Sequence, residues 1–272
     1  MDEAHTVEQT LGNPATVESI SHDLIQLGVK PGIVLLVHAS MSSLGWVSGG
    51  SVAIILALEN VLGPHGTLMM PTHSGDLSDP ANWQNPPVPK GWWKTIRETM
   101  PPYDPNLTPT RMMGRIAETF RKQQGVLRSD HPQVSFAAWG AEAQRVTAGH
   151  ELDFGLGEGS PLARIYDLDG WVLMLGVGYE NNTSLHLAEG RSSFPEKKVI
   201  TSGAPIFKDG QRDWVEIMDL YLDDSDFLEL SERFEREKGC VRRGKVAQAQ
   251  CRLMPQRDLV DYAVQWMEKN RR

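Results

Sequence analysis

The chain has 272 residues and a formal net charge of −8 at pH 7, and 40% of its residues are hydrophobic. This composition is typical of an ordinary globular protein and excludes a low-complexity or disordered chain. The acidic balance argues against unassisted nucleic-acid binding and is compatible with a cationic substrate.

Targeting and redox signals favour the cytoplasm. The first ten residues carry acids but neither a basic region nor an apolar core, so they do not predict a signal peptide. No apolar run approaches the roughly 20 residues that span a bilayer. Cys240 and Cys251 lack metal-ligand spacing and are expected to be reduced thiols. We therefore expect a cytoplasmic monomer or homodimer with no membrane or nucleic-acid partner.

The first elements alternate between helix and strand. Residues 1–15 are expected to form a loose arm before a single domain over residues 16–272. Thr16 can cap a helix that ends near Leu27, because apolar side chains recur there at helical spacing.

A continuous apolar run at residues 33–37 is typical of a strand buried on both faces of a sheet. A helix over 51–62 and a second buried strand over 67–70 follow. Strand, loop, helix and strand in this order predict an α/β fold, whose ligands gather at the edge where the strands end.

Residues 74–110 interrupt the alternation and contain eight of the seventeen prolines. A stretch this long with little regular structure is usually functional or disordered. Aromatic side chains argue against disorder, so we expect an ordered insertion that acts as a lid over the sheet edge. The alternative is a packing loop whose tryptophans only cover a core. The aromatic residues are Trp83, Trp92, Trp93 and Tyr103.

The rest of the chain continues the same pattern and shows no linker between domains. Ser160 and Pro161 open a short helix, since proline is favoured in the first helical turn. Helices are predicted over 110–122, 141–148, 226–238 and 257–269, and strands over 134–139, 171–178, 199–207 and 214–220.

A histidine and a glutamate follow the predicted strand at 171–178. Thr183 or Ser184 could cap a helix on which His186 and Glu189 stand three residues apart, so both side chains share one face. A carboxylate beside an imidazole holds its tautomer and stabilises its protonated form. This predicts His186 as a general base and Glu189 as its partner. The alternative is a solvated surface pair.

Three loops rich in glycine or hydroxyl side chains lie at the predicted strand ends, at 38–45, 128–135 and 155–160. Small residues let backbone N–H groups approach a phosphate or a thioester carbonyl, and a helix beginning near Gly50 adds a favourable dipole. The alternative is a set of tight structural turns. No dinucleotide or P-loop signature is present, so neither nucleotide fold is predicted.

A metal site and a serine hydrolase are not predicted. The sequence contains neither H-E-x-x-H nor paired cysteines, and no G-x-S-x-G elbow. Four dispersed histidines could still converge in space, namely His38, His73, His131 and His186.

Several segments together resemble the aminoglycoside 3-N-acetyltransferases, also called the antibiotic N-acetyltransferases. They occur in one order, and the resemblance spans roughly residues 16–270. The segments are 38–45 (HASMSSLG) with Gly49 and Gly50, 102–105 (PYDP), 128–132 (RSDHP), 157–162 (GEGSPL), 172–176 (VLMLG) and 185–189 (LHLAE).

The resemblance implies a three-layer α/β/α fold, unrelated to the GNAT fold, and acetyl-CoA as the acetyl donor without a metal. It assigns the general base to His186 and its carboxylate partner to Glu189. It also places CoA on a defined set of residues. These are His38, Ala39, Ser40, Met41, Ser42, Ser43, Leu44, Gly45, Arg128, Ser129, Ser135 and Phe154.

The acceptor implied by the resemblance is the 3-amino group on the 2-deoxystreptamine ring of an aminoglycoside. An alkylammonium has a reference pKa near 10, so a base must remove its proton before or during direct attack on the thioester. Backbone N–H groups of residues 40–42 would receive the developing oxyanion. Expected acceptor contacts are Thr72, Asp76, Asp104 and Glu158, with Asp223, Asp224 and Asp226 as an outer acidic rim or only a favourable helix start.

The chain departs from the family pattern at Ala247, where a second glycine is expected, and residues 242–245 are unexpectedly basic. Acceptor choice is expected to depend on residues 74–110, which do not match residue by residue. Two alternatives therefore stay open. One is an acetyltransferase of this fold that acts on a non-antibiotic amine. The other is a CoA-binding protein without turnover.

Overall fold

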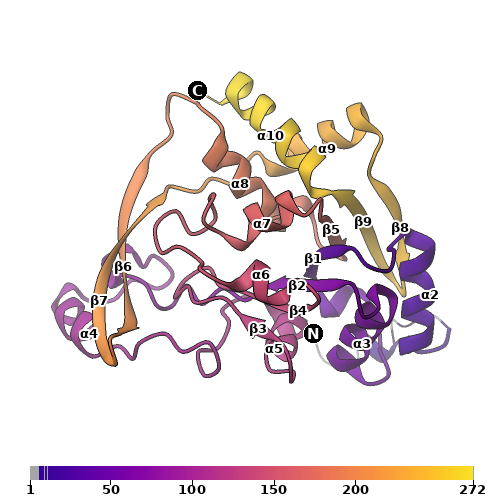
Figure 1. Cartoon of the computed structure of the whole chain (residues 1–272), viewed down its shortest axis with the longest axis horizontal. Coiled ribbons are helices and arrows are strands. Elements are labelled where there is room, and N and C mark those ends of the chain that lie inside the picture. Colours follow the sequence, from indigo (N-terminus) through magenta and orange to yellow (C-terminus); the bar gives the residue numbers. More distant parts are fainter. Residues whose placement is uncertain (1–5, 9, 11, 272) are drawn as a thin grey trace.

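A mixed sheet runs through the centre of the protein (Figure 1). The computed structural model describes residues 6–8, 10 and 12–271, and within them seven strands pair in the order β3-β4-β2-β1-β5-β9-β8. The strands are β1 (Val34–Ala39), β2 (Thr67–Pro71), β3 (Leu127–Arg128), β4 (Phe136–Gly140), β5 (Trp171–Leu175), β8 (Arg242–Val246) and β9 (Ala249–Pro255).

Only part of the sheet is parallel. β1 pairs in parallel with β2 and β5, as the alternation of helix and strand predicts. β4 runs antiparallel to β2, with Phe136 opposite Pro71. The loop at 128–135 therefore connects β3 to the antiparallel β4, and it lies at the edge where β1 and β2 end.

Helices cover both faces of the sheet, so the predicted three-layer α/β/α fold is confirmed. Along β1, Leu35 and Val37 pack on one side while Val34 and Leu36 pack on the other, as alternation in a buried strand requires. One face carries α2 (Val17–Leu27), α3 (Gly50–Leu62) and α5 (Gly114–Phe120). The other carries α6 (Ala143–Thr147), α7 (Pro161–Asp167), α8 (Ser184–Arg191), α9 (Phe227–Lys238) and α10 (Gln256–Asn270).

Local signals explain the bounds of the predicted helices. Thr16 caps α2 as expected, because its side chain accepts the Ser19 N–H while Ser19 bonds back to the Thr16 backbone. The helix predicted over 110–122 is shorter, since Met112 has φ of +58°. A left-handed residue interrupts a right-handed helix, so α5 begins after it, with Gly114 as its first residue.

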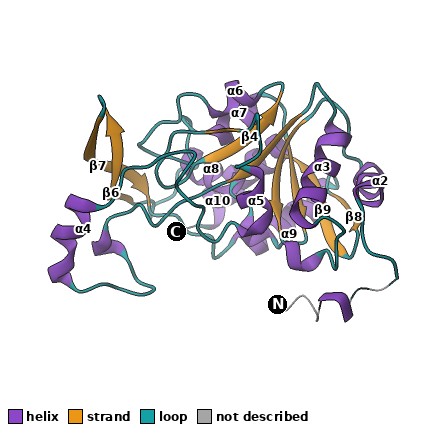
Figure 2. Ribbon diagram, turned by 90° about the horizontal axis from the view of Figure 1, so that it is seen from below, coloured by secondary structure: helices purple, strands orange, loops and turns teal. Residues whose placement is uncertain are grey.

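A separate hairpin of β6 (Val199–Lys208) and β7 (Gln211–Leu220) lies with α4 (Trp93–Thr99) at one end of the molecule, and α2 and β8 lie at the other (Figures 1 and 2). Segment 74–110 packs against this hairpin. The Tyr103 N–H donates to Pro205 O at 3.0 Å, and Arg212 Nε donates to Met100 O at 2.7 Å. Segment 74–110 is therefore held in place, while its action as a lid stays a prediction.

The predicted N-terminal arm can be compared with the structure only in part. The predicted arm, residues 1–15, falls partly outside the described residues, and Ala15 is buried and bridges Val47. The boundary at residue 16 stays a prediction. Among the helices in the described residues, none combines the length and apolar character needed to cross a membrane.

The hairpin of β8 and β9 was not predicted, because β8 (RRGKV) has almost no apolar side chains. Its pairing with β9 leaves Ala247 and Gln248 as a two-residue turn between Val246 and Ala249. Ala247 has φ of +49°, a conformation that favours glycine. The turn geometry thus explains why a glycine is expected at this position.

Replacing Ala247 by glycine should raise the free energy of unfolding by roughly 0.5–1 kcal/mol, because relief of left-handed strain outweighs the greater freedom of the unfolded chain. Urea denaturation measures this change. The matched control is Ala249→Gly, two residues along in regular β9, which should lower the free energy of unfolding by about 1 kcal/mol. Equal losses in the two variants would contradict the strain argument.

Candidate active site

The loop at 38–45 follows β1 and packs against the end of β5. Its Ser40 N–H donates to Leu175 O at 3.0 Å, and the Ser43 hydroxyl donates to Ser40 O at 2.8 Å. Gly176, just after β5, has φ of +71°, and a Cβ there would lie 1.7 Å from Ser43 Oγ. Glycine is therefore needed for the two loops to meet at this edge.

The helix α8, which carries the predicted base, begins beside this loop. Thr183 occupies the N-cap position of α8 as expected, but its side chain makes no capping hydrogen bond. The Ser184 N–H instead donates to Asn182 Oδ1 at 3.1 Å. Thr183 Oγ1 lies 3.4 Å from Nε2 of His38. The loop at 38–45 thus contacts the start of the helix that bears His186.

His186 and Glu189 form the predicted pair. His186 Nδ1 is hydrogen-bonded to Glu189 Oε2, and the ring centre of Phe227 lies 4.9 Å from that of the imidazole. If Nδ1 carries the proton that Glu189 accepts, Nε2 is the basic nitrogen. Within the described part of the chain, Nε2 has no hydrogen-bond partner, so it is free to accept a proton.

The Glu189 carboxylate is almost completely buried, with its side chain 2% exposed. Its Oε1 accepts the Asp223 N–H at 3.1 Å and Arg271 Nη1 at 2.5 Å, while its Oε2 faces His186. Three donors therefore satisfy this buried acceptor, as a carboxylate removed from water requires.

His186 lines a cavity of about 310 Å3 whose walls carry four carboxylates. We call it the acidic cavity. Glu158 was predicted as an acceptor contact and lies here, where it also forms a bidentate ion pair with Arg191 at 2.6 and 3.0 Å. Sequence reasoning missed the other three carboxylates, which are Glu151, Asp153 and Asp219.

Asp219 on β7 is the half-buried member of this group. Burial raises the pKa of Asp219, while hydrogen bonding from Leu220 N–H and the nearby His186 act in the opposite direction. Asp153 Oδ1 accepts the Met218 N–H at 2.8 Å, which ties the loop before α7 to the same strand. The cavity is thus built from segments that lie far apart in the sequence.

Phe154 was predicted to bind CoA and forms part of the wall of the acidic cavity. It has φ of +51° and is 38% exposed, and its N–H donates to Met218 O at 2.8 Å. A non-glycine residue in left-handed backbone at a cavity wall is typical of a functional site, because neighbouring contacts must hold it there. Its contact with CoA stays a prediction.

His38 is buried beside a second cavity of about 100 Å3 that also includes Thr183 and Met113. Burial, and then the nearby His186, lower the pKa of His38 to about 3. Burial likewise lowers the pKa of His73 to about 3. Both imidazoles are therefore neutral near pH 7. Among the described residues, no three His, Cys, Asp or Glu side chains gather as a metal site.

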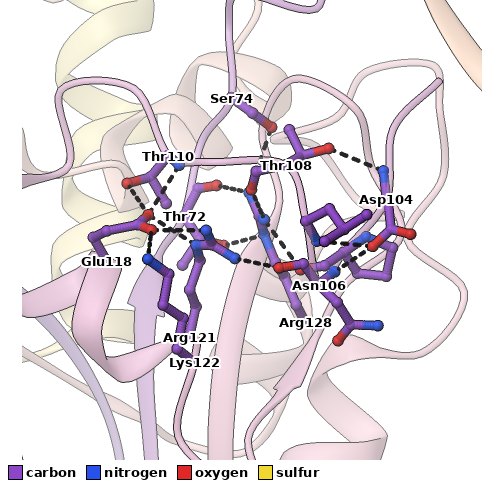
Figure 3. Close-up of polar contacts among 12 residues, drawn as sticks. Thr72, Ser74, Asp104, Asn106, Thr108, Thr110, Glu118, Arg121, Lys122 and Arg128 are labelled. Atoms are coloured by element: carbon purple, nitrogen blue, oxygen red, sulfur yellow. Dashed lines mark hydrogen bonds and ion pairs between the residues drawn. The ribbon is translucent and has the colours of Figure 1, made fainter. Parts of the chain in front are cut away.

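Arg128 is the centre of a hydrogen-bond network beneath segment 74–110 (Figure 3). Its Nη1 donates to Thr108 O at 2.6 Å and Pro105 O at 3.2 Å, and its Nη2 donates to Thr72 O at 2.6 Å. Its Nε donates to Ser135 Oγ at 3.0 Å. Every nitrogen of the guanidinium thus already has a protein partner.

The neighbouring residues predicted to bind ligands, Ser129, Ser135 and Thr72, also form hydrogen bonds within the protein. Ser129 Oγ is 2.9 Å from His150 Nδ1 and accepts the Phe136 N–H, and Ser135 Oγ donates to Thr72 O at 2.9 Å. These hydroxyl groups are buried, as is Thr72. Binding of CoA by Arg128, Ser129 and Ser135, and of the acceptor by Thr72, stays a prediction, but the observed contacts are internal.

Asp76 and Asp104, the remaining predicted acceptor contacts, also have partners within the protein. Asp76 pairs with Arg111, and Asp104 Oδ1 accepts the N–H groups of Asn106 at 2.7 Å and Leu107 at 2.9 Å. Neither side chain lines the acidic cavity. Figure 3 shows Asp104 folded against the turn that Arg128 anchors.

A model of the family described as aminoglycoside 3-N-acetyltransferase matches residues 36–268. The chain is 47% identical over 258 residues to a Bacillus subtilis (strain 168) protein named SPbeta prophage-derived aminoglycoside N(3')-acetyltransferase-like protein YokD, with 94% of each chain covered. The crystal structure of YokD matches with a TM-score of 0.95 and 46% identity, and 98% of each chain is covered.

Two further solved structures were determined with ligands. The structure titled AAC-IIIb binary with CoASH has a TM-score of 0.84 and 33% identity, covering 94% of this chain and 97% of its own. A room-temperature structure of sisomicin-bound AAC-VIa has a TM-score of 0.82 and 29% identity, covering 94% of this chain and 99% of its own.

Replacing Arg128 by alanine should lower the free energy of unfolding by roughly 2–4 kcal/mol, because several buried carbonyl groups lose their donor. Arg128→Lys should recover little, since an ammonium group cannot reach carbonyls on several sides. Urea denaturation measures stability, and limited trypsin digestion reports the opening of segment 74–110. The control is Arg111→Ala, whose half-exposed ion pair should contribute at most about 0.5 kcal/mol. If trypsin cleaved Arg128→Ala at the same rate as the wild type, this role for Arg128 would be contradicted.

Proposed function

The chain belongs to the aminoglycoside 3-N-acetyltransferase family, and we propose that it transfers the acetyl group of acetyl-CoA to the 3-amino group of an aminoglycoside. The family match spans most of the chain. The observation that carries the proposal is that His186, held by Glu189, lies in the wall of the acidic cavity. A base and an anionic site for cations thus occur together, which the transfer of an acyl group to an amine requires.

The acidic cavity is the proposed acceptor site. Aminoglycosides carry several ammonium groups, and a concave site in which four carboxylates outnumber the single lysine, Lys197, attracts such a polycation. The volume of about 310 Å3 lies at the small end of typical ligand pockets. Binding of sisomicin by the related AAC-VIa supports this acceptor class.

The donor is proposed to lie along the loop at 38–45, beside the start of α8. The related AAC-IIIb binds CoASH, which supports CoA as the carrier of the acetyl group. The Ser40 N–H is committed to Leu175 O, so it does not serve the predicted oxyanion site in this arrangement. We assign that role to the N–H groups of Met41 and Ser42, which follow it in the loop.

In the proposed reaction the acceptor nitrogen attacks the thioester carbonyl carbon directly. The N–C bond forms as His186 Nε2 takes the amine proton, and the C–S bond then breaks with the electron pair leaving on the CoA sulfur. Glu189 stabilises the imidazolium that forms. Cys251 does not suit an acyl-enzyme route, because burial raises the pKa of its thiol to about 11.

Replacing His186 by alanine should lower kcat by roughly 10²–10⁴-fold, because the amine loses its general base. Thiol release from acetyl-CoA in the presence of gentamicin, kanamycin, apramycin or no acceptor measures this effect. The control is His65→Ala, an exposed histidine in the turn between α3 and β2, which should keep wild-type turnover.

The three possible outcomes separate the candidate functions. Acceptor-dependent release that is lost in His186→Ala supports the transferase. If CoA raised the melting temperature of the wild type but no acceptor stimulated thiol release, the donor site would stand and an aminoglycoside acceptor would be rejected. Undiminished turnover in His186→Ala would reject the proposed base.

Replacing Asp219 by asparagine should raise KM for the aminoglycoside by about tenfold, since one charged contact to an ammonium group is lost. KM for acetyl-CoA should change little, because Asp219 lies in the acidic cavity and not in the loop at 38–45. Steady-state kinetics with each substrate varied in turn measure both values. The control is Asp213→Asn on the same strand, an exposed carboxylate outside the cavity. Equal effects of the two variants would exclude a local role for Asp219.

A further inference from the structure

We propose that Arg271, just after the end of α10, is a positioning residue that holds the Glu189 carboxylate in place for His186. This inference rests on the proposed acetyl transfer, in which His186 acts as the base. Arg271 does not line the acidic cavity, so it acts through Glu189 and not by contact with a substrate.

The contacts of Arg271 are those of a guanidinium fixed on several sides. Its Nη1 donates to Glu189 Oε1 at 2.5 Å. Its Nε and Nη2 form a bidentate pair with Asp226 at 2.7 and 2.6 Å, and Nη2 also donates to Asp223 O at 2.7 Å. Bidentate pairing fixes the orientation of the guanidinium plane as well as its position.

The surroundings of Arg271 restrict it further. Its side chain is only 9% exposed, and the guanidinium carbon lies 5.3 Å from the ring centre of Phe194 and 6.0 Å from that of Phe227. Phe227 also packs against the imidazole of His186. One aromatic ring therefore touches both the arginine and the proposed base.

Three helices meet at this point. Glu189 belongs to α8, Asp226 immediately precedes α9, and Arg271 follows α10. Figure 1 shows α8 and α10 close to the C-terminus, and the two helices are in contact. The guanidinium thus connects the start of α9 and the end of α10 to Glu189, the carboxylate that holds His186.

Arg271 balances the negative charges of two carboxylates, and its loss would therefore affect His186. Glu189 and Asp226 are two carboxylates that share Arg271 as their common cation. Without it, Glu189 would lose its charged donor while still buried, so the carboxylate would turn away or take up a proton. Either change removes the acceptor for His186 Nδ1–H and leaves the imidazole without a fixed tautomer.

Other charged or titratable groups near the pair do not replace this contact. Lys197 Nζ donates to Gly190 O at 2.7 Å and Ser192 O at 2.9 Å, at the end of α8, instead of to Glu189. His186 also interacts electrostatically with Asp219, His38 and His73, none of which contacts Glu189 in the described part of the chain. Arg271 is therefore the cation that directly contacts Glu189 in the described part of the chain.

The test uses Arg271→Ala, Arg271→Lys and the control Arg257→Ala in the full chain. Arg257 lies in the first turn of the same helix and pairs with Asp169 at 3.0 Å. We expect Arg271→Ala to lower kcat by about 10–100-fold, as for residues that orient a catalytic group, with both KM values within about twofold of wild type. Arg271→Lys should lose less, because it keeps the charge, and Arg257→Ala should keep wild-type kcat.

Chemical rescue separates positioning from packing. Guanidinium ion, at concentrations too low to unfold the protein, should restore part of the kcat of Arg271→Ala and should not stimulate Arg257→Ala. Unchanged kcat in Arg271→Ala would overturn the proposal. A loss that matches a loss of folded protein and is insensitive to guanidinium would overturn it as well.

A spectroscopic measurement makes the test independent of turnover. The His186 Nδ1–H should give a far-downfield proton resonance in the wild type because it is hydrogen-bonded to the Glu189 carboxylate, and Arg271→Ala should lose it. Persistence of this resonance would contradict the positioning role. If the wild type turns over no acceptor, the proposed function fails while the resonance still decides the contact. Should Arg271→Ala not fold, Asp226→Asn tests the same link, with an intermediate loss expected.

Discussion

The burial of the Glu189 carboxylate is the constraint on which the active site depends. A carboxylate removed from water must be matched by donors, and here the donors come from the imidazole of His186, the backbone of Asp223 and the guanidinium of Arg271. Because these groups belong to different segments, α8 cannot shift without breaking at least one of the contacts. The orientation of the imidazole is thus a consequence of how α8, α9 and α10 pack together.

A second charge, the half-buried Arg128, connects distant segments at the strand ends in a comparable way. Its partners are mainly backbone carbonyl groups, including Thr72 O just after β2 and Thr108 O in segment 74–110. A guanidinium with donors in several directions can connect chain segments that share no regular structure. This explains how a stretch rich in proline is held in one arrangement next to the sheet without a helix or strand at the point of contact.

The acidic cavity shows how a binding surface arises from ordinary elements. Glu151, Asp153 and Glu158 belong to the glycine-rich loop before α7, while Asp219 comes from β7 in the hairpin. The loop reaches the hairpin through backbone bonds such as Phe154 N–H to Met218 O. The carboxylates and the imidazole therefore line one cavity because this loop is hydrogen-bonded to β7.

The sequence alone determined the features that depend on neighbours within a turn or a strand. Apolar runs and capping residues indicated β1, α2 and an α/β fold, while the three-layer arrangement was implied only by the family resemblance. A spacing of three residues placed His186 beside Glu189, because helix geometry itself brings such side chains together. Only the tertiary structure decided the rest. β8 has no apolar pattern and exists because β9 pairs with it, and Arg271 meets Glu189 across 82 residues. Such contacts depend on packing between distant segments, which no local pattern in the chain encodes.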